Sequence, residues 1–138
     1  VVLSARREVT EIIRVRPAPP RPLGQEETYL PCHLFADLDR RRLTGSLYAI
    51  MRKDYDLAPH EAQEWLEPAI ATEEHAKLLS VEPGAALMLV TRTSYTAAGV
   101  AVEHAYDRYR SDRTRISLRT SSSTTVSAEL VAASGGRR

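Results

Sequence analysis

The sequence contains a single cysteine, Cys32, so no disulfide can form within the chain and nothing favours a secreted, oxidising setting. No apolar run approaches the roughly 20 residues that a membrane-spanning helix needs. The opening VVLSARREV becomes charged too soon for a signal peptide. We therefore expect a cytoplasmic protein without a membrane partner.

An excess of charge of either sign is also missing. The chain has 19 Lys and Arg residues and 18 Asp and Glu residues, which gives a formal net charge of +1. This balance provides no overall attraction to nucleic acid or membrane. The short basic run Arg40 to Arg42 is typical of a solvated helix end, so we do not expect this chain itself to bind DNA.

The signatures of common catalytic and metal sites are absent as well. The four histidines lie at neither the helical i, i+4 nor the strand i, i+2 ligand spacing, and the sequence has no HExxH, CxxC, GxSxG, P-loop or GxGxxG. Cys32 and His33 are adjacent, and neighbours on a strand point in opposite directions. We therefore predict no catalytic residue, no metal and no cofactor.

What remains is the composition of one globular domain. The 138 residues are 43% hydrophobic and 27% charged, and this length is sufficient for a real core. The chain begins at Val1 in an apolar stretch, which indicates a piece of a longer protein. After residue 119 the sequence is rich in Ser, Thr and small residues. We expect a folded domain at 1–119 and a flexible tail at 120–138, with one helical turn at 126–132.

The order of predicted elements is strands, then helices, then strands, which indicates an α+β fold. Alternation predicts strands at 9–16 and 25–31, joined by the proline-rich PAPPRP loop. Apolar periodicity and capping residues predict helices at 33–43, 44–56 and 72–84. An antiparallel meander is expected from strands at 85–95, 100–110 and 113–119. Residues 60–71 favour a helix by propensity but also suit an edge strand.

The most unusual stretch is VEHAYDRYRSDR, residues 102–113. On a strand, Glu103, Ala105, Asp107 and Tyr109 fall on one face, because residues two apart share a face. Two explanations are open for such a polar face on a strand inside a sheet. Either the face is solvated, or it forms the floor of a polar pocket.

Two arginines on an earlier strand suggest what such a pocket would bind. Arg14 and Arg16 project from one strand face and can both hold a carboxylate or phosphate, although cross-strand salt bridges on a surface would use them equally well. Ser46 opens a helix, where free backbone N–H groups attract anions, and it also suits simple capping. Tyr48 adds a hydroxyl beyond it.

Acids could receive the rest of a ligand. Glu26 and Glu103 could accept hydrogen bonds from hydroxyls or an amine, while each alone is more typical of a surface charge.

Several motifs, in order, resemble those of the effector-binding (UTRA) domain of GntR-family, HutC-type bacterial transcription regulators. They are RVR, EETYLP, GSLY, EPAIATEEHAKLLSVEPGAALMLVTRTSY and VEHAYDRYRSDR, and the resemblance covers roughly residues 9–119. It implies an antiparallel sheet with flanking helices, similar to the chorismate-lyase fold. It also favours a strand for residues 60–71.

The resemblance further implies a homodimer that binds a small anionic metabolite and thereby changes DNA affinity. DNA would be bound by an N-terminal winged helix-turn-helix domain that this sequence does not contain. Matched by motif, Arg14 and Arg16 hold a phosphate in amino-sugar-phosphate-sensing members, with the residues of the GSLY motif, Ser46 and Tyr48, at the same anionic end. Glu26 matches the ligand-binding acid that opens the ExxxxP strand, and Glu103 and Tyr109 match ligand-binding positions near the sugar end.

We therefore expect a sensor domain of a transcriptional repressor and not an enzyme. Sugar phosphates and small carboxylates both suit its two arginines. Two alternatives remain open. One is a lyase-like enzyme of similar fold that uses Glu103 as an acid, and the other is a pure dimerisation module with an empty pocket.

Overall fold

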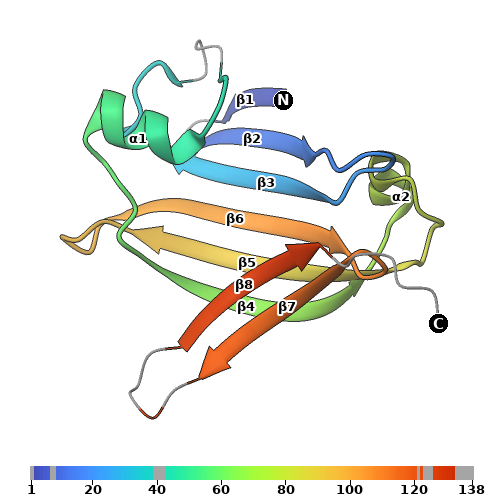
Figure 1. Cartoon of the computed structure of the whole chain (residues 1–138). Helices are drawn as coiled ribbons and strands as arrows, with labels where there is room; N and C mark the ends of the chain where they lie inside the picture. The colour runs from blue at the N-terminus through green and yellow to red at the C-terminus, as the bar shows by residue number, and fades with distance from the viewer. Residues whose placement is uncertain (1, 7–8, 39–42, 121, 123–125, 133–138) are drawn as a thin grey trace.

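The structure is a computed structural model that describes residues 2–6, 9–38, 43–120, 122 and 126–132. Its body is a six-stranded antiparallel sheet with the order β1-β2-β3-β6-β5-β4 (Figure 1), and a second sheet pairs β7 with β8. The elements are β1 (Val2–Arg6), β2 (Val9–Arg16), β3 (Gly24–Pro31), α1 (Leu47–Tyr55), β4 (Glu61–Ile70), α2 (Glu73–Leu79), β5 (Ala86–Tyr95), β6 (Ala101–Arg110), β7 (Thr114–Thr120) and β8 (Val126–Ala132). This architecture confirms the α+β prediction.

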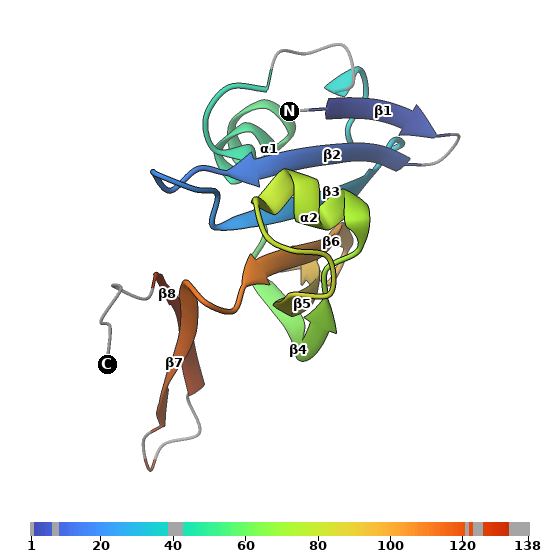
Figure 2. The ribbon, with the colours of Figure 1, turned by 90° about the vertical axis from the view of Figure 1, so that its right-hand side faces the viewer.

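The two helices belong to separate apolar clusters. Helix α1 packs Leu47 and Met51 against Ile12 of β2 and Leu30 of β3, on the face that also carries Arg14. Helix α2 packs Ala76 and Leu79 against Leu87 at the start of β5. Figure 2 shows the helices on different sides of the sheet. No helix among the described residues is long and apolar enough to cross a membrane.

Both helices begin at the predicted caps. Ser46 is the N-cap of α1, and its hydroxyl accepts a hydrogen bond from the Ala49 amide at 3.4 Å. Thr72 caps α2 in the same way, through the His75 amide at 3.2 Å. Helix α2 ends earlier than predicted, because Ser80 takes the left-handed conformation at its C-cap.

Residues 60–71 form a strand, as the resemblance implied and against helix propensity. Every residue of β4 pairs with β5, from Glu61 with Tyr95 to Ile70 with Ala86. This ladder decides the conformation, because tertiary pairing outweighs a weak local preference. Strand β1 was not predicted, and it pairs with β2 along its whole length.

The helix predicted at 33–43 is wrong for the residues that the structure describes. Residues 32–38 form successive turns, and Asp37 has a positive φ of 58° that interrupts helical geometry. The turns nevertheless bury Phe35 and Leu38, each 1% exposed, beneath α1. Residues 39–42, with the basic run Arg40 to Arg42, lie outside the described residues.

The predicted three-strand meander is wrong in its last strand. Strand β6 already pairs with β3 on one side and β5 on the other, so β7 finds no free position beside it. The chain turns at 111–113 and β7 pairs instead with β8. The helical turn predicted at 126–132 is therefore also wrong, because these residues form β8. The domain boundary at residue 119 stays a prediction.

The proline-rich loop is fixed beside the end of β2. The Leu23 amide donates to the Arg16 carbonyl at 3.0 Å, and the Arg113 guanidinium donates to the Ala18 carbonyl at 3.0 Å. Gly24 follows, and a Cβ atom there would lie 2.7 Å from the Tyr109 ring. Glycine at this position lets β3 pass close beneath Tyr109, which belongs to the site described next.

Candidate functional site

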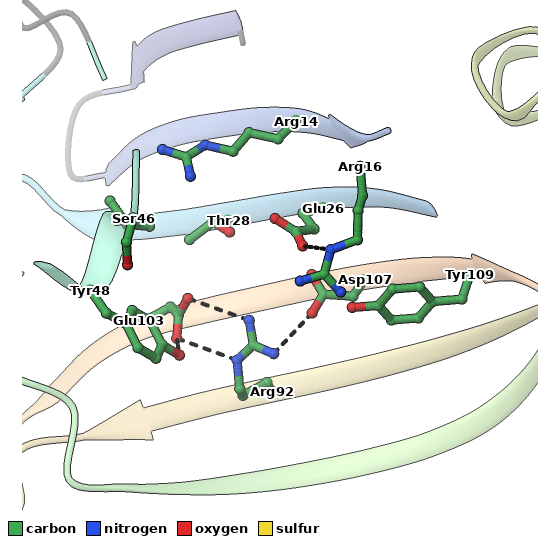
Figure 3. Close-up of a pocket in the computed structure, with 11 residues that line it drawn as sticks. Arg14, Arg16, Glu26, Thr28, Ser46, Tyr48, Arg92, Glu103, Asp107 and Tyr109 are labelled. Carbon is green, nitrogen blue, oxygen red and sulfur yellow. Dashed lines mark hydrogen bonds and ion pairs between the residues drawn. The ribbon is translucent and has the colours of Figure 1, made fainter. Parts of the chain in front are cut away.

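A cavity of about 400 Å³ opens on the sheet face beside the N-terminus of α1 (Figure 3). Strands β2, β3, β5 and β6 supply its floor and walls, and the start of α1 closes one end. The lining residues are Arg14, Arg16, Glu26, Thr28, Ser46, Leu47, Tyr48, Arg92, Glu103, Asp107 and Tyr109.

All of the ligand-binding residues predicted from the sequence line this one cavity. They are Arg14, Arg16, Glu26, Ser46, Tyr48, Glu103 and Tyr109. The polar face of β6 is thus the floor of a pocket and not a solvated surface, since Glu103 is 3% and Asp107 2% exposed. That these residues bind a ligand remains a prediction.

Four lining residues were missed. Asp107 shares a strand face with Glu103, and Thr28 shares one with Glu26, so strand alternation could have identified both. Leu47 follows the predicted cap directly. Arg92 could not have been found in this way, because its place depends on the register that sets it opposite Ala105, between the two acids of β6.

Arg92 lies in the middle of the floor and joins both β6 acids. Its Nη1 donates to Asp107 Oδ2 at 2.9 Å, while its Nε and Nη2 lie 3.4 and 3.5 Å from the Glu103 oxygens. Glu64 of β4 approaches Nη1 at 3.6 Å. Burial lowers the pKa of the Arg92 guanidinium, but the stronger combined effect of Glu103 and Asp107 raises it above its ordinary value. The arginine is therefore permanently charged.

Glu103 is committed to contacts within the protein. Its Oε2 accepts hydrogen bonds from Tyr48 Oη and Ser94 Oγ, both at 2.6 Å, in addition to Arg92. Burial and the bond to Glu103 raise the pKa of Tyr48 to about 12, so the phenol remains a donor. Glu103 therefore fixes the positions of Tyr48 and Arg92 in the cavity wall.

Asp107 is less well satisfied. Its Oδ1 is buried and has no hydrogen-bond partner in the described part of the chain. Burial raises the pKa of the Asp107 carboxyl to about 6, against the attraction of Arg92 and with added repulsion from Glu26. A buried acceptor without a donor is costly, so this oxygen is a natural place for a ligand hydrogen bond.

The opposite end of the cavity is electropositive. Arg14 donates to the Gly45 carbonyl at 3.4 Å, but its Nε and Nη2 are buried and lack partners among the residues described. They lie near Ser46, where the first amides of α1 and its dipole favour negative charge (Figure 3). Arg16 turns toward Glu26, with Nε 3.4 Å from Oε1. The cavity thus suits a ligand with an anionic group at one end and hydrogen-bond donors at the other.

The sequence matches the UTRA domain family over residues 2–115. It is 34% identical over 105 residues to the HTH-type transcriptional repressor NagR of Bacillus subtilis (strain 168), which covers 76% of this chain and 43% of that protein. The chain spans about half the length of the curated relatives it matches.

Solved structures of similar fold include the effector domain of PhnF from Mycobacterium smegmatis. It has 29% identity and a TM-score of 0.70, over 76% of this chain and 65% of that one. A GntR-family transcriptional regulator from Enterococcus faecalis V583 has 21% identity and a TM-score of 0.73, over 81% of each chain. The similarity to the Enterococcus faecalis protein shows only that the two chains share a fold.

The titration of Asp107 should appear in the free energy of unfolding. Its pKa of about 6 in the folded state exceeds the value of about 3.9 in an unfolded chain, so the folded state binds more protons between these values. Its stabilising contribution is full below about pH 4 and is lost as the pH rises through 6. The unfolding free energy of the wild type minus that of Asp107→Asn should fall by about 2 kcal/mol from pH 4 to pH 7.

Urea unfolding followed by circular dichroism at several pH values measures this difference. Glu64→Gln is the matched control, because Glu64 also faces Arg92 but is 39% exposed. A difference between wild type and Asp107→Asn that stays constant with pH would show that Asp107 is not the titrating group.

Proposed function

The chain belongs to the UTRA domain family, and from this we propose that it is the effector-sensing domain of a GntR-family, HutC-type transcriptional repressor. Its effector is an anionic metabolite, a sugar phosphate or a small carboxylate. One observation carries the proposal. Arg14 has buried N–H groups that find no acceptor among the described residues, and it lies beside a helix N-terminus in a cavity whose far end is lined by acids.

The anionic group of the effector binds between β2 and the start of α1. Guanidinium N–H groups that are buried without acceptors cost free energy, and a phosphate or carboxylate satisfies them. The Ser46 hydroxyl and the first amides of α1 supply further donors on the other side of the anion. The remainder of the effector extends over the floor toward Asp107 and Tyr109.

Binding at this position adds a polar link between β2 and the start of α1, which also share the apolar cluster of Ile12, Leu47 and Met51. Arg14 of β2 contacts the residue before the α1 cap through a 3.4 Å hydrogen bond to the Gly45 carbonyl. An anion held by both sides draws α1 toward β2, and the ligand thereby favours one arrangement of the domain over another. In this proposal a separate N-terminal domain binds DNA. The whole regulator works in the cytoplasm, because its operator DNA is there.

The domain acts without changing its effector chemically. A lyase-like enzyme of similar fold would use Glu103 as an acid, but Tyr48, Ser94 and Arg92 occupy both oxygens of that carboxylate. These contacts suit a structural role for Glu103. Recovery of an intact ligand after long incubation with the protein, followed by NMR, distinguishes a sensor from an enzyme.

Anion binding should stabilise the wild type and depend on Arg14. A ligand at 100 times its dissociation constant adds about 2.7 kcal/mol to the unfolding free energy when it binds only the folded state. We expect at least one compound in a millimolar panel of inorganic phosphate, sugar phosphates and carboxylates to raise the melting temperature. Arg14→Ala should abolish the increase, because it removes the buried donors.

Arg52→Ala is the control for general loss of positive charge, because Arg52 is exposed in the last turn of α1. It should retain the response. An equal loss of response in both variants, or a full response in Arg14→Ala, would contradict binding at the proposed site.

The proposed sensor is a homodimer, and the exposed apolar residues indicate the surface. Strand β4 is the last strand of the main sheet, and nine of its ten residues are exposed, including Trp65, Leu66 and Ile70. The β7-β8 hairpin projects nearby and exposes Leu118 (Figure 2). A two-stranded hairpin is marginally stable alone, and a sheet edge is open to another strand. We infer that each protomer packs its hairpin and β4 against its partner.

Sedimentation velocity at micromolar concentration tests this surface. The wild type should sediment as a dimer, and Leu118→Glu should shift it to a monomer, because a charge would be buried at the interface. Val100→Glu is the control, since Val100 is exposed in the β5-β6 turn, away from the patch. A wild-type monomer, or a dimer that survives Leu118→Glu, would rule out this interface.

A further inference from the structure

The β7-β8 hairpin leaves the main sheet through the short turn at residues 111–113 (Figure 1). Strand β6, which forms part of the cavity floor, ends at Arg110 immediately before this turn, and β7 begins at Thr114 immediately after it. Within the described residues, neither hairpin strand pairs with a strand of the main sheet. The contacts that hold this turn therefore help to set the direction in which the hairpin projects.

Arg110 fixes the start of the turn. It is 3% exposed, and its Nη1 donates to the carbonyl of Leu79, the last residue of α2, at 3.1 Å. Its Nε and Nη2 donate to the Asp112 carboxylate at 3.0 and 2.7 Å. The hydroxyl of Thr114 in turn donates to the Arg110 carbonyl. The start of the turn is thus anchored to the end of α2.

Arg113, at the end of the same turn, reaches a different part of the molecule. Its Nη1 donates to the Ala18 carbonyl at 3.0 Å and also to the Arg21 carbonyl. Both carbonyls lie in the proline-rich loop between β2 and β3, and Ala18 is 95 residues away in the sequence. A planar guanidinium that holds two carbonyls fixes their geometry more firmly than a single donor would. One side chain therefore ties the loop to the base of the hairpin.

The same loop is continuous with the wall of the cavity. It follows directly on Arg16, which is the last residue of β2 and lines the cavity. Near its other end, the Leu23 carbonyl accepts a hydrogen bond from the Arg110 amide at 3.0 Å, and Leu23 packs against Tyr109, another lining residue. A bound molecule that displaces the end of β2 therefore displaces the loop, and through Arg113 it also displaces the hairpin.

We propose that Arg113 transmits effector binding from the cavity to the β7-β8 hairpin. Arg113 does not line the cavity, so it is a positioning residue that keeps the loop and the hairpin in one unit. This inference rests on the proposed anion-sensing function and specifies how the occupied site acts on the surface assigned to the dimer. A two-stranded hairpin is marginally stable, so its opening is sensitive to what holds its base. An anion that steadies the end of β2 steadies the loop and thereby the hairpin.

Hydrogen exchange of the 138-residue chain, with and without millimolar inorganic phosphate, follows the site and the hairpin in one experiment. Slower exchange of the amides at 47–50, in the first turn of α1, reports an occupied anion site. Slower exchange at 114–120, in β7, reports transmission. In the wild type we expect both effects, with exchange in β7 slowed about fivefold or more, the lower end of usual coupling between two sites.

Variants assign the transmission to Arg113. Arg113→Ala should keep the slower exchange in α1 and lose most of the effect in β7. Arg113→Lys is a milder change that keeps the charge but lacks the planar fork, so it should also weaken the response of β7. Arg115→Ala is the matched control, because it removes an exposed arginine of β7 itself, and it should respond like the wild type.

The outcomes separate this inference from the function on which it rests. Phosphate that slows exchange in α1 of the wild type but leaves β7 unchanged would overturn transmission and leave the sensor in place. A β7 response that persists in both Arg113 variants, or that Arg115→Ala removes equally, would do the same. If phosphate changes neither region of the wild type, the proposed anion site fails and this inference fails with it.

Discussion

The arrangement of the cavity depends on Arg92, which is held between Glu103 and Asp107. A buried guanidinium and two buried carboxylates are stable together only when their geometry is good, and removal of one partner leaves an uncompensated charge. The central pairing of β5 with β6 places the three groups, because the register sets Arg92 between the two acids. Tyr48 and Ser94 then complete the hydrogen bonding of Glu103.

The two ends of the cavity, on either side of this network, differ in their hydrogen-bonding groups. Glu103 is hydrogen-bonded within the protein, whereas Asp107 Oδ1, beside Glu26, has no donor among the residues that the structure describes. At the other end, beside the N-terminus of α1, Arg14 has buried donors that lack acceptors in the described part of the chain. A ligand that bridges the two ends contacts β2, β6 and α1 at once, which is how binding in a small cavity can change the relation between a sheet and a helix.

Local patterns were sufficient to predict much of this site. Alternation placed Arg14 and Arg16 on one face and Glu103 and Tyr109 on another, and capping chemistry placed Ser46 at a helix start. The family resemblance combined these positions into one pocket. Arg92 was missed because strand register is not local. Likewise, β7 was expected beside β6, but nothing within its own residues shows that both edges of β6 are occupied by β3 and β5.

The most direct test of the account is a crystal structure of the domain grown with inorganic phosphate. We expect phosphate bound to the Arg14 guanidinium and the N-terminus of α1. Phosphate bound elsewhere, for example beside Arg21 and Arg110 at the far end of the sheet, would contradict it.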